Sequence, residues 1–107
     1  MRVLLVDDHA GIPRALSRCF KGDGWEPITA LSVDEAYSII PYVDVVVTDY
    51  EMPNGGGESV VKSCNEYNVP CVVLTGNESV EYKYTVLKPS QYSLILKAVN
   101  LAMKGGL

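Results

Sequence analysis

Short apolar runs recur along the chain, and four of them end at a group with distinctive chemistry. The runs are residues 3–6, 45–48, 71–74 and 85–87, and they are followed by Asp7 with Asp8, by Asp49, by Thr75 and by Lys88. Near-continuous apolar runs of this length are typical of strands buried on both faces of a parallel sheet. Ligands of open parallel sheets bind beyond the carboxyl ends of the strands. The pattern therefore predicts that carboxylates, a hydroxyl and an ammonium group meet at one edge of a sheet.

Strand and helix patterns alternate from one end of the chain to the other. The predicted strands are residues 2–6, 26–30, 43–48, 69–74 and 84–87. The first predicted helix has Pro13 in its first turn and ends at residues 21–24. The others are a helix opened by a Ser32–Glu35 capping box that stops before Pro41, one at residues 57–67, and one that Ser90 caps and that reaches about Met103. This alternation predicts one doubly wound α/β domain over residues 1–107, without an effector domain.

The connection between the last two strands is unusually short. Residues 76–83 are the whole predicted crossover, whereas a helical crossover takes at least ~10–12 residues. These residues reach ~26–29 Å when extended, which is enough to retrace a strand of ~16 Å but not with a helix of several turns. We therefore expect the helix between these two strands, which would be the fourth along the chain, to be absent or about one turn long.

Composition excludes several classes of protein. The net charge of -4 argues against nucleic-acid binding, because a nucleic-acid partner requires a basic face. No apolar run approaches the ~20 residues of a membrane helix, and we expect neither a membrane partner nor a signal peptide. The three cysteines, Cys19, Cys64 and Cys71, lack metal-site spacing. They are interpreted as reduced, mostly buried thiols of a cytoplasmic protein.

The acidic residues at the strand ends favour a bound cation. Asp7, Asp8 and Asp49 repel one another if they lie close together, so that either one takes up a proton or a cation neutralises the group. Magnesium fits, because it is a hard cation that is held by one or two carboxylates together with phosphate oxygens. The alternative is that Asp7 and Asp8 form only a polar turn. Thr75 and Lys88 at equivalent strand ends favour the magnesium interpretation.

These residues also carry a family resemblance, which covers essentially the whole chain. The matching elements are Asp7-Asp8 with Arg14, the run Asp49-Tyr50-Glu51-Met52-Pro53 with Gly57, Thr75-Gly76, and Lys88-Pro89. In these elements the chain resembles the receiver domain of two-component response regulators. The resemblance implies a flavodoxin-like, five-stranded parallel sheet of order 2-1-3-4-5 and a cis Lys88–Pro89 bond.

The resemblance also implies roles for the residues at the strand ends. Asp49 is expected to take a phosphoryl group from a phosphohistidine, with Lys88 and Thr75 contacting phosphoryl oxygens. Asp8, Asp49 and the backbone carbonyl of Glu51 are the implied magnesium ligands, with Asp7 acting mainly through water. Gly76 leaves room for the phosphoryl group.

Further residues near these positions are less strongly assigned. Glu51 and Asn77 match positions that tune the lifetime of the acyl phosphate, and their alternative role is that of exposed loop residues. His9 is expected to be a solvated side chain, and packing accounts for Trp25.

The implied function is that of a stand-alone receiver in a two-component phosphorelay, which catalyses only its own phosphorylation and dephosphorylation. The implied partners are a histidine kinase or histidine phosphotransfer protein and a downstream protein target. Two alternatives remain open: a magnesium-dependent phosphohydrolase that uses Asp49 or Asp7 as nucleophile, and an interaction module that is never phosphorylated.

Output contacts are expected on the altered side of the domain. The family usually has an aromatic residue three positions before the lysine, whereas this chain has Thr85 there, next to Tyr84. Either Tyr82 and Tyr84 fold over the gap left by the short crossover, or a partner covers it. A second copy of the chain is one such partner, in contact through the last two strands and the last helix with Leu94 and Leu101.

Overall fold

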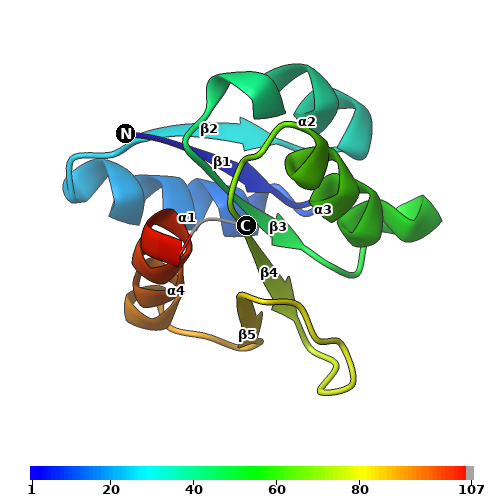
Figure 1. Ribbon diagram of the computed structural model, residues 1–107. Coiled ribbons are helices and arrows are strands. Elements are labelled where there is room, and N and C mark those ends of the chain that lie inside the picture. Colours follow the sequence, from blue (N-terminus) through cyan, green and yellow to red (C-terminus); the bar gives the residue numbers. More distant parts are fainter. Residues whose placement is uncertain (106–107) are drawn as a thin grey trace.

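Five parallel strands form the centre of the protein, whose residues 1–105 are described by a computed structural model. The strands are β1 (Arg2–Val6), β2 (Glu26–Ala30), β3 (Val45–Asp49), β4 (Cys71–Thr75) and β5 (Thr85–Leu87). Their order is β2-β1-β3-β4-β5, and every neighbouring pair is parallel (Figure 1). The predicted doubly wound α/β fold and strand order are therefore confirmed.

Helices cover both faces of the sheet. Helices α1 (Gly11–Gly22) and α4 (Tyr92–Gly105) pack on one face, and α2 (Val33–Ile39) and α3 (Gly56–Glu66) pack on the other (Figure 1). Two short 3-10 helices, η1 (Ile40–Tyr42) and η2 (Pro53–Gly55), precede β3 and α3. The fourth α-helix in chain order is thus the C-terminal one.

The core consists of two apolar clusters separated by the sheet. Alternate residues of a strand point to opposite faces, so Leu4 and Val46 join the α2–α3 cluster while Leu5 and Val47 join the α1–α4 cluster. Every residue of β3 is buried, as are Val3 to Val6 of β1. Burial on both faces explains why these strands appear as continuous apolar runs in the sequence.

Three predicted strands begin later than expected, and of these β5 differs by a single residue, beginning at Thr85 rather than residue 84. Strand β3 begins at Val45 rather than residue 43, because Asp44 forms a turn contact: its Oδ2 accepts the Arg2 N–H at 2.7 Å. Strand β4 begins at Cys71 rather than residue 69. Pro70 has no N–H for the sheet, and Asn68 has a positive φ of 56° that turns the chain before it.

The capping box at the start of α2 is present with one change. The Glu35 N–H donates to Ser32 Oγ at 3.1 Å, as predicted. The Glu35 carboxylate, however, accepts from the N–H of Leu31 at 3.1 Å, one residue before the cap. The helix start is still held from both sides, and it fixes the end of β2 close to α2.

The prediction that Ser90 caps the last helix is wrong. Helix α4 begins at Tyr92, and the Gln91 carbonyl accepts the first helical N–H groups, from Leu94 and Ile95. The Ser90 hydroxyl instead donates to the carbonyl of Leu87. Ser90 therefore holds the turn between β5 and α4, and the helix starts after it.

The shortened crossover is confirmed. Residues 76–84, all of which are described, contain no helix. They form the loop that lies beside β4 and β5 in Figure 1. Its end is fixed by Thr85, whose Oγ1 accepts the Tyr82 N–H at 2.8 Å and donates to the Tyr82 carbonyl at 3.0 Å. The loop therefore turns tightly into β5 without helical structure.

The two tyrosines of this loop line the same small cavity of 140 Å³ on the α3 side. The Tyr82 ring also lies 5.8 Å from the ring of Tyr50, and Tyr84 also packs against the α1–α4 cluster. Both tyrosines therefore border the space beside the short crossover, in keeping with the first of the two alternatives. Strand β4 is well covered, with Val73 fully buried, whereas Leu87 of β5 is 46% exposed.

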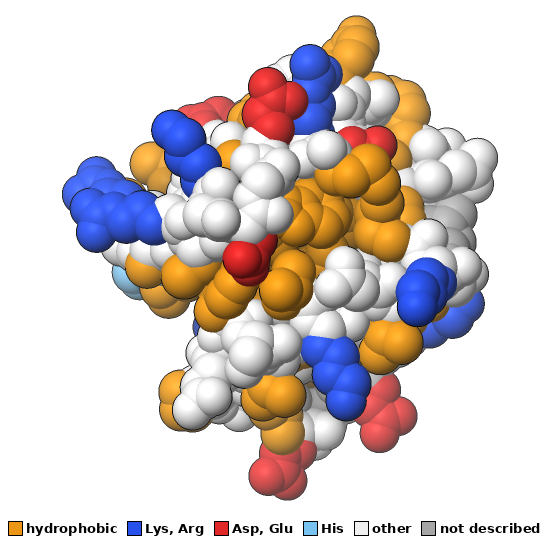
Figure 2. Space-filling view, turned by 90° about the vertical axis from the view of Figure 1, so that its left-hand side faces the viewer, with side chains coloured by type: hydrophobic (Ala, Val, Ile, Leu, Met, Phe, Trp, Pro, Cys, Tyr) orange, Lys and Arg blue, Asp and Glu red, His pale blue; other side chains and the backbone are white. Residues whose placement is uncertain are grey.

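Exposed apolar side chains are distributed over several faces. Leu94 and Leu101 of α4 are exposed, as expected. The side of the molecule that lies on the left of Figure 1 has hydrophobic side chains at its centre, with Lys and Arg toward the edges (Figure 2). Exposed apolar surface is ordinary in monomers, so a contact with a partner or second copy stays a prediction.

The three cysteines are free thiols, as predicted, but their burial differs. Cys64 is buried, Cys71 is half-buried and Cys19 is exposed, so the expectation of mostly buried thiols fails for Cys19. A hydrogen bond with Cys64, followed by burial, raises the pKa of the Cys71 thiol. Cys71 therefore stays protonated and acts as a packing residue against α3.

Candidate functional site

The sheet register places four strand ends at one edge. Val6 pairs with Thr48, so the next residues, Asp7 just after β1 and Asp49 at the end of β3, lie at the same level of the sheet. On the other side of β3, Thr75 is the last residue of β4, and its carbonyl accepts the N–H of Lys88 at 2.7 Å. Because β1, β3, β4 and β5 are neighbours in the sheet, these side chains lie at one edge, as the sequence predicts.

Asp49 and Lys88 form an ion pair at the centre of the site. Lys88 Nζ donates to Asp49 Oδ1 at 2.6 Å, and the Asp49 side chain is only 4% exposed. Burial is the largest influence on the pKa of Lys88 and lowers it. The hydrogen bond and charge of Asp49, with the charges of Glu51 and Asp7, outweigh it and leave that pKa raised. The predicted cis Lys88–Pro89 bond is confirmed.

The end of β1 carries a compact group of possible cation ligands. One ligand atom from each of Asp7, Asp8 and His9 lies within 4.8 Å of the others. Asp7 is buried, and burial, followed by the charge of Asp49, raises the pKa of its carboxyl group even though the His9 N–H donates to it at 2.9 Å. His9 is exposed, as expected, but its Nδ1 lies 3.2 Å from Asp8 Oδ1. The sequence interpretation missed this proximity.

This donor set fits a magnesium ion. The charges of Asp49 and of the adjacent Asp8 both contribute to the raised pKa of Asp7, so negative charge is concentrated at this strand end. A hard dication offsets that excess negative charge and prefers carboxylate oxygens. Asp7 and Asp8 are therefore suited to hold the ion, while ligation by Asp49 and by the Glu51 carbonyl stays a prediction.

The loop after β3 is shaped by its glycines. A Cβ on Gly57 would lie 2.4 Å from both Cα and O of Tyr50, so only glycine lets α3 begin this close to the loop. Asn54 and Gly55 both have positive φ, of 61° and 66°, in the turn before the helix. Met52 is buried beneath them. These requirements explain the spacing from Asp49 to Gly57 and fix the backbone around Glu51.

Glu51 makes contacts that the sequence did not reveal. Its Oε1 accepts a hydrogen bond from Thr75 Oγ1 at 2.7 Å and another from the Gly76 N–H at 2.8 Å. Burial is the largest influence on the pKa of Glu51 and raises it. The two hydrogen bonds and the charge of Lys88 act in the opposite direction and leave that pKa lowered, so Glu51 is ionised at neutral pH.

Asn77 also contacts Thr75, at the same end of β4. Its N–H donates to Thr75 Oγ1 at 3.1 Å, and its Oδ1 accepts the N–H of Ser79 at 2.9 Å. Asn77 is exposed, and it orients the Thr75 hydroxyl from the loop side. Glu51 and Asn77, which the sequence placed near the site, are thus both linked to Thr75.

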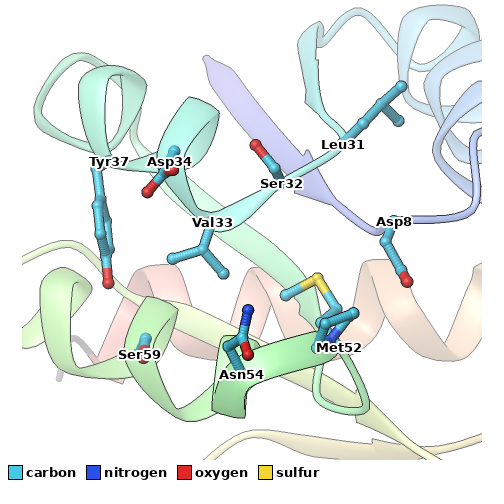
Figure 3. Close-up of a pocket in the computed structure, with 10 residues that line it drawn as sticks. Asp8, Leu31, Ser32, Val33, Asp34, Tyr37, Met52, Asn54 and Ser59 are labelled. Carbon is cyan, nitrogen blue, oxygen red and sulfur yellow. The ribbon is translucent and has the colours of Figure 1, made fainter.

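An open hollow lies beside Asp8. It has a volume of about 360 Å³ and runs between the start of α2 and the loop after β3 (Figure 3). Asp8 stands at one end of it, with Met52 nearby and Tyr37 at the other end (Figure 3).

Two residues quoted from the sequence lie elsewhere. Arg14 is exposed on α1 and lines a different hollow with Arg18 and Lys21. Trp25 packs against Phe20, with ring centroids 5.6 Å apart, just before the start of β2. It is therefore at the opposite end of that strand from the site, which confirms a packing role.

Within residues 1–105, none of the helices has both the length and the apolar character needed to cross a membrane.

Known proteins match the chain over nearly its whole length. The family described as "Response regulator receiver domain" matches residues 3–103. The regulatory protein AtoC of Escherichia coli (strain K12) is 28% identical over 94% of this chain, and the probable transcriptional regulator ycf27 of Porphyridium aerugineum is 31% identical over 90%. The chain spans 23% and 41% of the lengths of these relatives. The receiver domain of the Francisella response regulator 1452 superposes with a TM-score of 0.85, at 26% identity and with 97% of each chain covered.

Proposed function

The chain belongs to the response regulator receiver domain family, and we propose that it accepts a phosphoryl group on Asp49 from a histidine kinase or a histidine phosphotransfer protein. One observation supports this most strongly. Asp49 is buried at the end of β3 with the Lys88 ammonium at 2.6 Å, and the Thr75 hydroxyl lies at the end of the neighbouring strand. A nucleophile, a cation and a hydroxyl donor in this order are what phosphoryl transfer requires.

The transfer is a displacement at phosphorus. An oxygen of Asp49 forms a bond to phosphorus while the bond between phosphorus and the donor imidazole nitrogen breaks, and that nitrogen keeps the electron pair and takes a proton from water. Lys88 holds the carboxylate in place and then offers its charge to a phosphoryl oxygen. Thr75 donates its hydroxyl hydrogen to another oxygen.

Magnesium is the proposed cofactor. Asp7, Asp8, Asp49 and the Glu51 carbonyl would hold it, and it would screen the negative charges of the carboxylate and the incoming phosphoryl group. Asp7 is buried and ionises reluctantly, so it contributes through water rather than as the first ligand. The protein in this proposal catalyses only its own phosphorylation and dephosphorylation.

Signal output in this proposal passes through a protein contact. The net charge of -4 does not suit nucleic acid, so a downstream protein is the proposed target of this domain. Both relatives carry regulatory names, in keeping with a place in two-component signalling. A cytoplasmic location fits the proposed donor and the three free thiols.

The decisive experiment labels the protein with acetyl phosphate in the presence of magnesium. Wild type is expected to gain one hydroxylamine-labile phosphoryl group, detected by intact mass, and Asp49→Asn is expected to gain none. Asp34→Asn, a change at an exposed carboxylate of α2, is the matched control and should label like wild type. Equal labelling of Asp49→Asn and wild type would exclude Asp49 as the acceptor. No labelling of wild type would favour the interaction module.

A second experiment tests the metal ligands. Asp8→Ala is expected to weaken magnesium binding by about tenfold or more, because it removes one of the few charged ligands. The same change should slightly raise thermal stability without metal, since it relieves repulsion on Asp7. Magnesium binding is best followed through the amide resonances of residues 7–9, because Trp25 lies far from the site. Unchanged magnesium affinity would remove Asp8 from the ligand set.

A further inference from the structure

Two hydrogen-bond donors at the end of β4 converge on a single carboxylate oxygen. Thr75 Oγ1 and the Gly76 N–H both donate to Glu51 Oε1, at 2.7 and 2.8 Å. These distances are those of charge-assisted hydrogen bonds. Because the donors lie beside the Asp49–Lys88 pair, Glu51 places an anionic oxygen at the corner where a group attached to Asp49 would extend.

Each of these donors can serve only one strong acceptor at a time. The Thr75 hydroxyl has one hydrogen and the Gly76 amide has one, and both are now directed at Glu51. A phosphoryl group on Asp49 would bring negatively charged oxygens that need such donors. The Glu51 carboxylate and the phosphoryl oxygens therefore exclude one another from this corner, by shared donors and by like charge.

Glu51 can leave this position easily. The residue is exposed, although its carboxylate is held by the two donors. A carboxylate that swings out of the corner regains water at once, so its departure costs little beyond the two hydrogen bonds. A buried side chain would have no such route.

Building on the proposed function, we infer that the Glu51 side chain is an internal competitor of the phosphoryl group. In the resting protein it occupies the Thr75 and Gly76 donors, and it must leave before they can hold an acyl phosphate on Asp49. Glu51 thus slows phosphorylation of Asp49.

The competition also links the site to the shortened crossover. Gly76 is the first residue of the loop at 76–84, and Glu51 holds it there. The residue before Glu51, Tyr50, contacts Tyr82 near the end of the same loop. Displacement of Glu51 by a phosphoryl group changes what fixes the start of the loop, so occupation of Asp49 is transmitted to the face beside β5.

Four variants separate occupation of the donors from the charge of Glu51. Glu51→Ala removes both the contact and the charge, whereas Glu51→Asp keeps the charge on a side chain too short to reach Thr75 and Gly76. Glu51→Gln loses the charge but keeps an oxygen acceptor at the same length. Glu58→Ala, at an exposed carboxylate in the first turn of α3, is the matched control.

The first readout needs no phosphodonor. The Gly76 amide proton resonance should move upfield in Glu51→Ala and Glu51→Asp, because that N–H loses a charged acceptor, and should stay in place in Glu58→Ala. An unchanged Gly76 resonance in Glu51→Ala would show that the contact is absent in solution and would overturn the inference.

The second readout is the rate of labelling by acetyl phosphate with magnesium. Glu51→Ala and Glu51→Asp should label about tenfold faster than wild type, the effect of one charge-assisted hydrogen bond, with Glu51→Gln in between. Faster labelling of Glu51→Ala and Glu51→Gln but not of Glu51→Asp would assign the effect to charge and overturn the inference. Equal rates in all variants would overturn it too, while the proposed function would stand. If no chain is labelled, the proposed function fails and the inference falls with it.

Discussion

The two halves of the sheet are held in place by different forces. In the half built on β1 and β3, strands are buried on both faces by helices, and Leu4, Val46 and Val47 are almost completely inaccessible to solvent. In the other half, β5 has only three residues, all partly exposed. The connection from β4 to β5 contains no helix. Its loop is fixed by polar contacts at Gly76 and by the Tyr50–Tyr82 pair.

The difference shows that the arrangement of the strand-end side chains does not depend on a helix between β4 and β5. Thr75 and Lys88 are positioned by the pairing of β4 with β5, through the hydrogen bond from Lys88 N–H to the Thr75 carbonyl. Strand ends alone therefore align the hydroxyl and the ammonium with Asp49. The surface that a helix here would cover is left to the loop at residues 76–84. The position of that loop depends on residues of the site itself.

The largest expected effect compares one leucine from each half. Leu4→Ala removes a completely buried side chain from β1 and should lower the free energy of unfolding by about 2–5 kcal/mol. Leu87→Ala, in β5, removes a side chain that is 46% exposed and should cost less than about 1 kcal/mol. Urea unfolding of both variants gives the two values.

Equal losses in that experiment would contradict the comparison. They would mean that β5 is buried in solution by a contact that the isolated chain does not show, such as a second copy. Repeating the Leu87→Ala measurement over a range of protein concentrations distinguishes that case, because only an association makes stability depend on concentration.

A smaller effect is expected from the turn that fixes the β3 side of the site. Gly57→Ala places a Cβ 2.4 Å from the Tyr50 backbone, so α3 has to shift, at a cost of about 1–3 kcal/mol. The same shift displaces the loop that holds Glu51 and should slow labelling of Asp49. Gly22→Ala is the control: it meets no atom within 4 Å and should be neutral or stabilise by up to about 1 kcal/mol. Matching stabilities of the two variants would show that the loop yields freely.

The meeting of the strand-end residues was predictable from the sequence for a physical reason, whereas the strand order was implied only by the family resemblance. Burial on both faces makes the central strands continuous apolar runs, and a run stops where the strand leaves the core, which is where Asp7, Asp49 and Thr75 stand. The length of residues 76–83 likewise fixed the absence of a helix, because chain reach is set by covalent geometry.

Other features were not predictable because they depend on contacts made only after folding. The late start of β3 follows from an Asp44 side chain that meets Arg2 across the sheet. The Glu51 contacts join residues that are far apart in the sequence. Nothing in the residues next to Glu51 indicates that Thr75 will be its partner. A glutamate in a loop has no pattern that distinguishes such a partner from solvent.

The smallest expected effect concerns the pH dependence of the crossover. Burial, followed by a hydrogen bond with Tyr50, raises the pKa of Tyr82 from 10.0 to about 12. Tyr82 therefore contributes stability that is fully present below pH ~10, the unfolded-state pKa of tyrosine, and is lost as pH rises toward the folded-state value. At neutral pH, Tyr82→Phe should be less stable than wild type by less than about 1 kcal/mol, and that difference should shrink as pH rises above ~10.

Urea unfolding of wild type and Tyr82→Phe at several pH values measures this difference in stability. Tyr67→Phe, which alters an exposed tyrosine just after α3, is the control. A difference that stays constant with pH would show that the Tyr82 hydroxyl is solvated and that apolar contacts alone hold the crossover, which would make the two halves of the sheet alike.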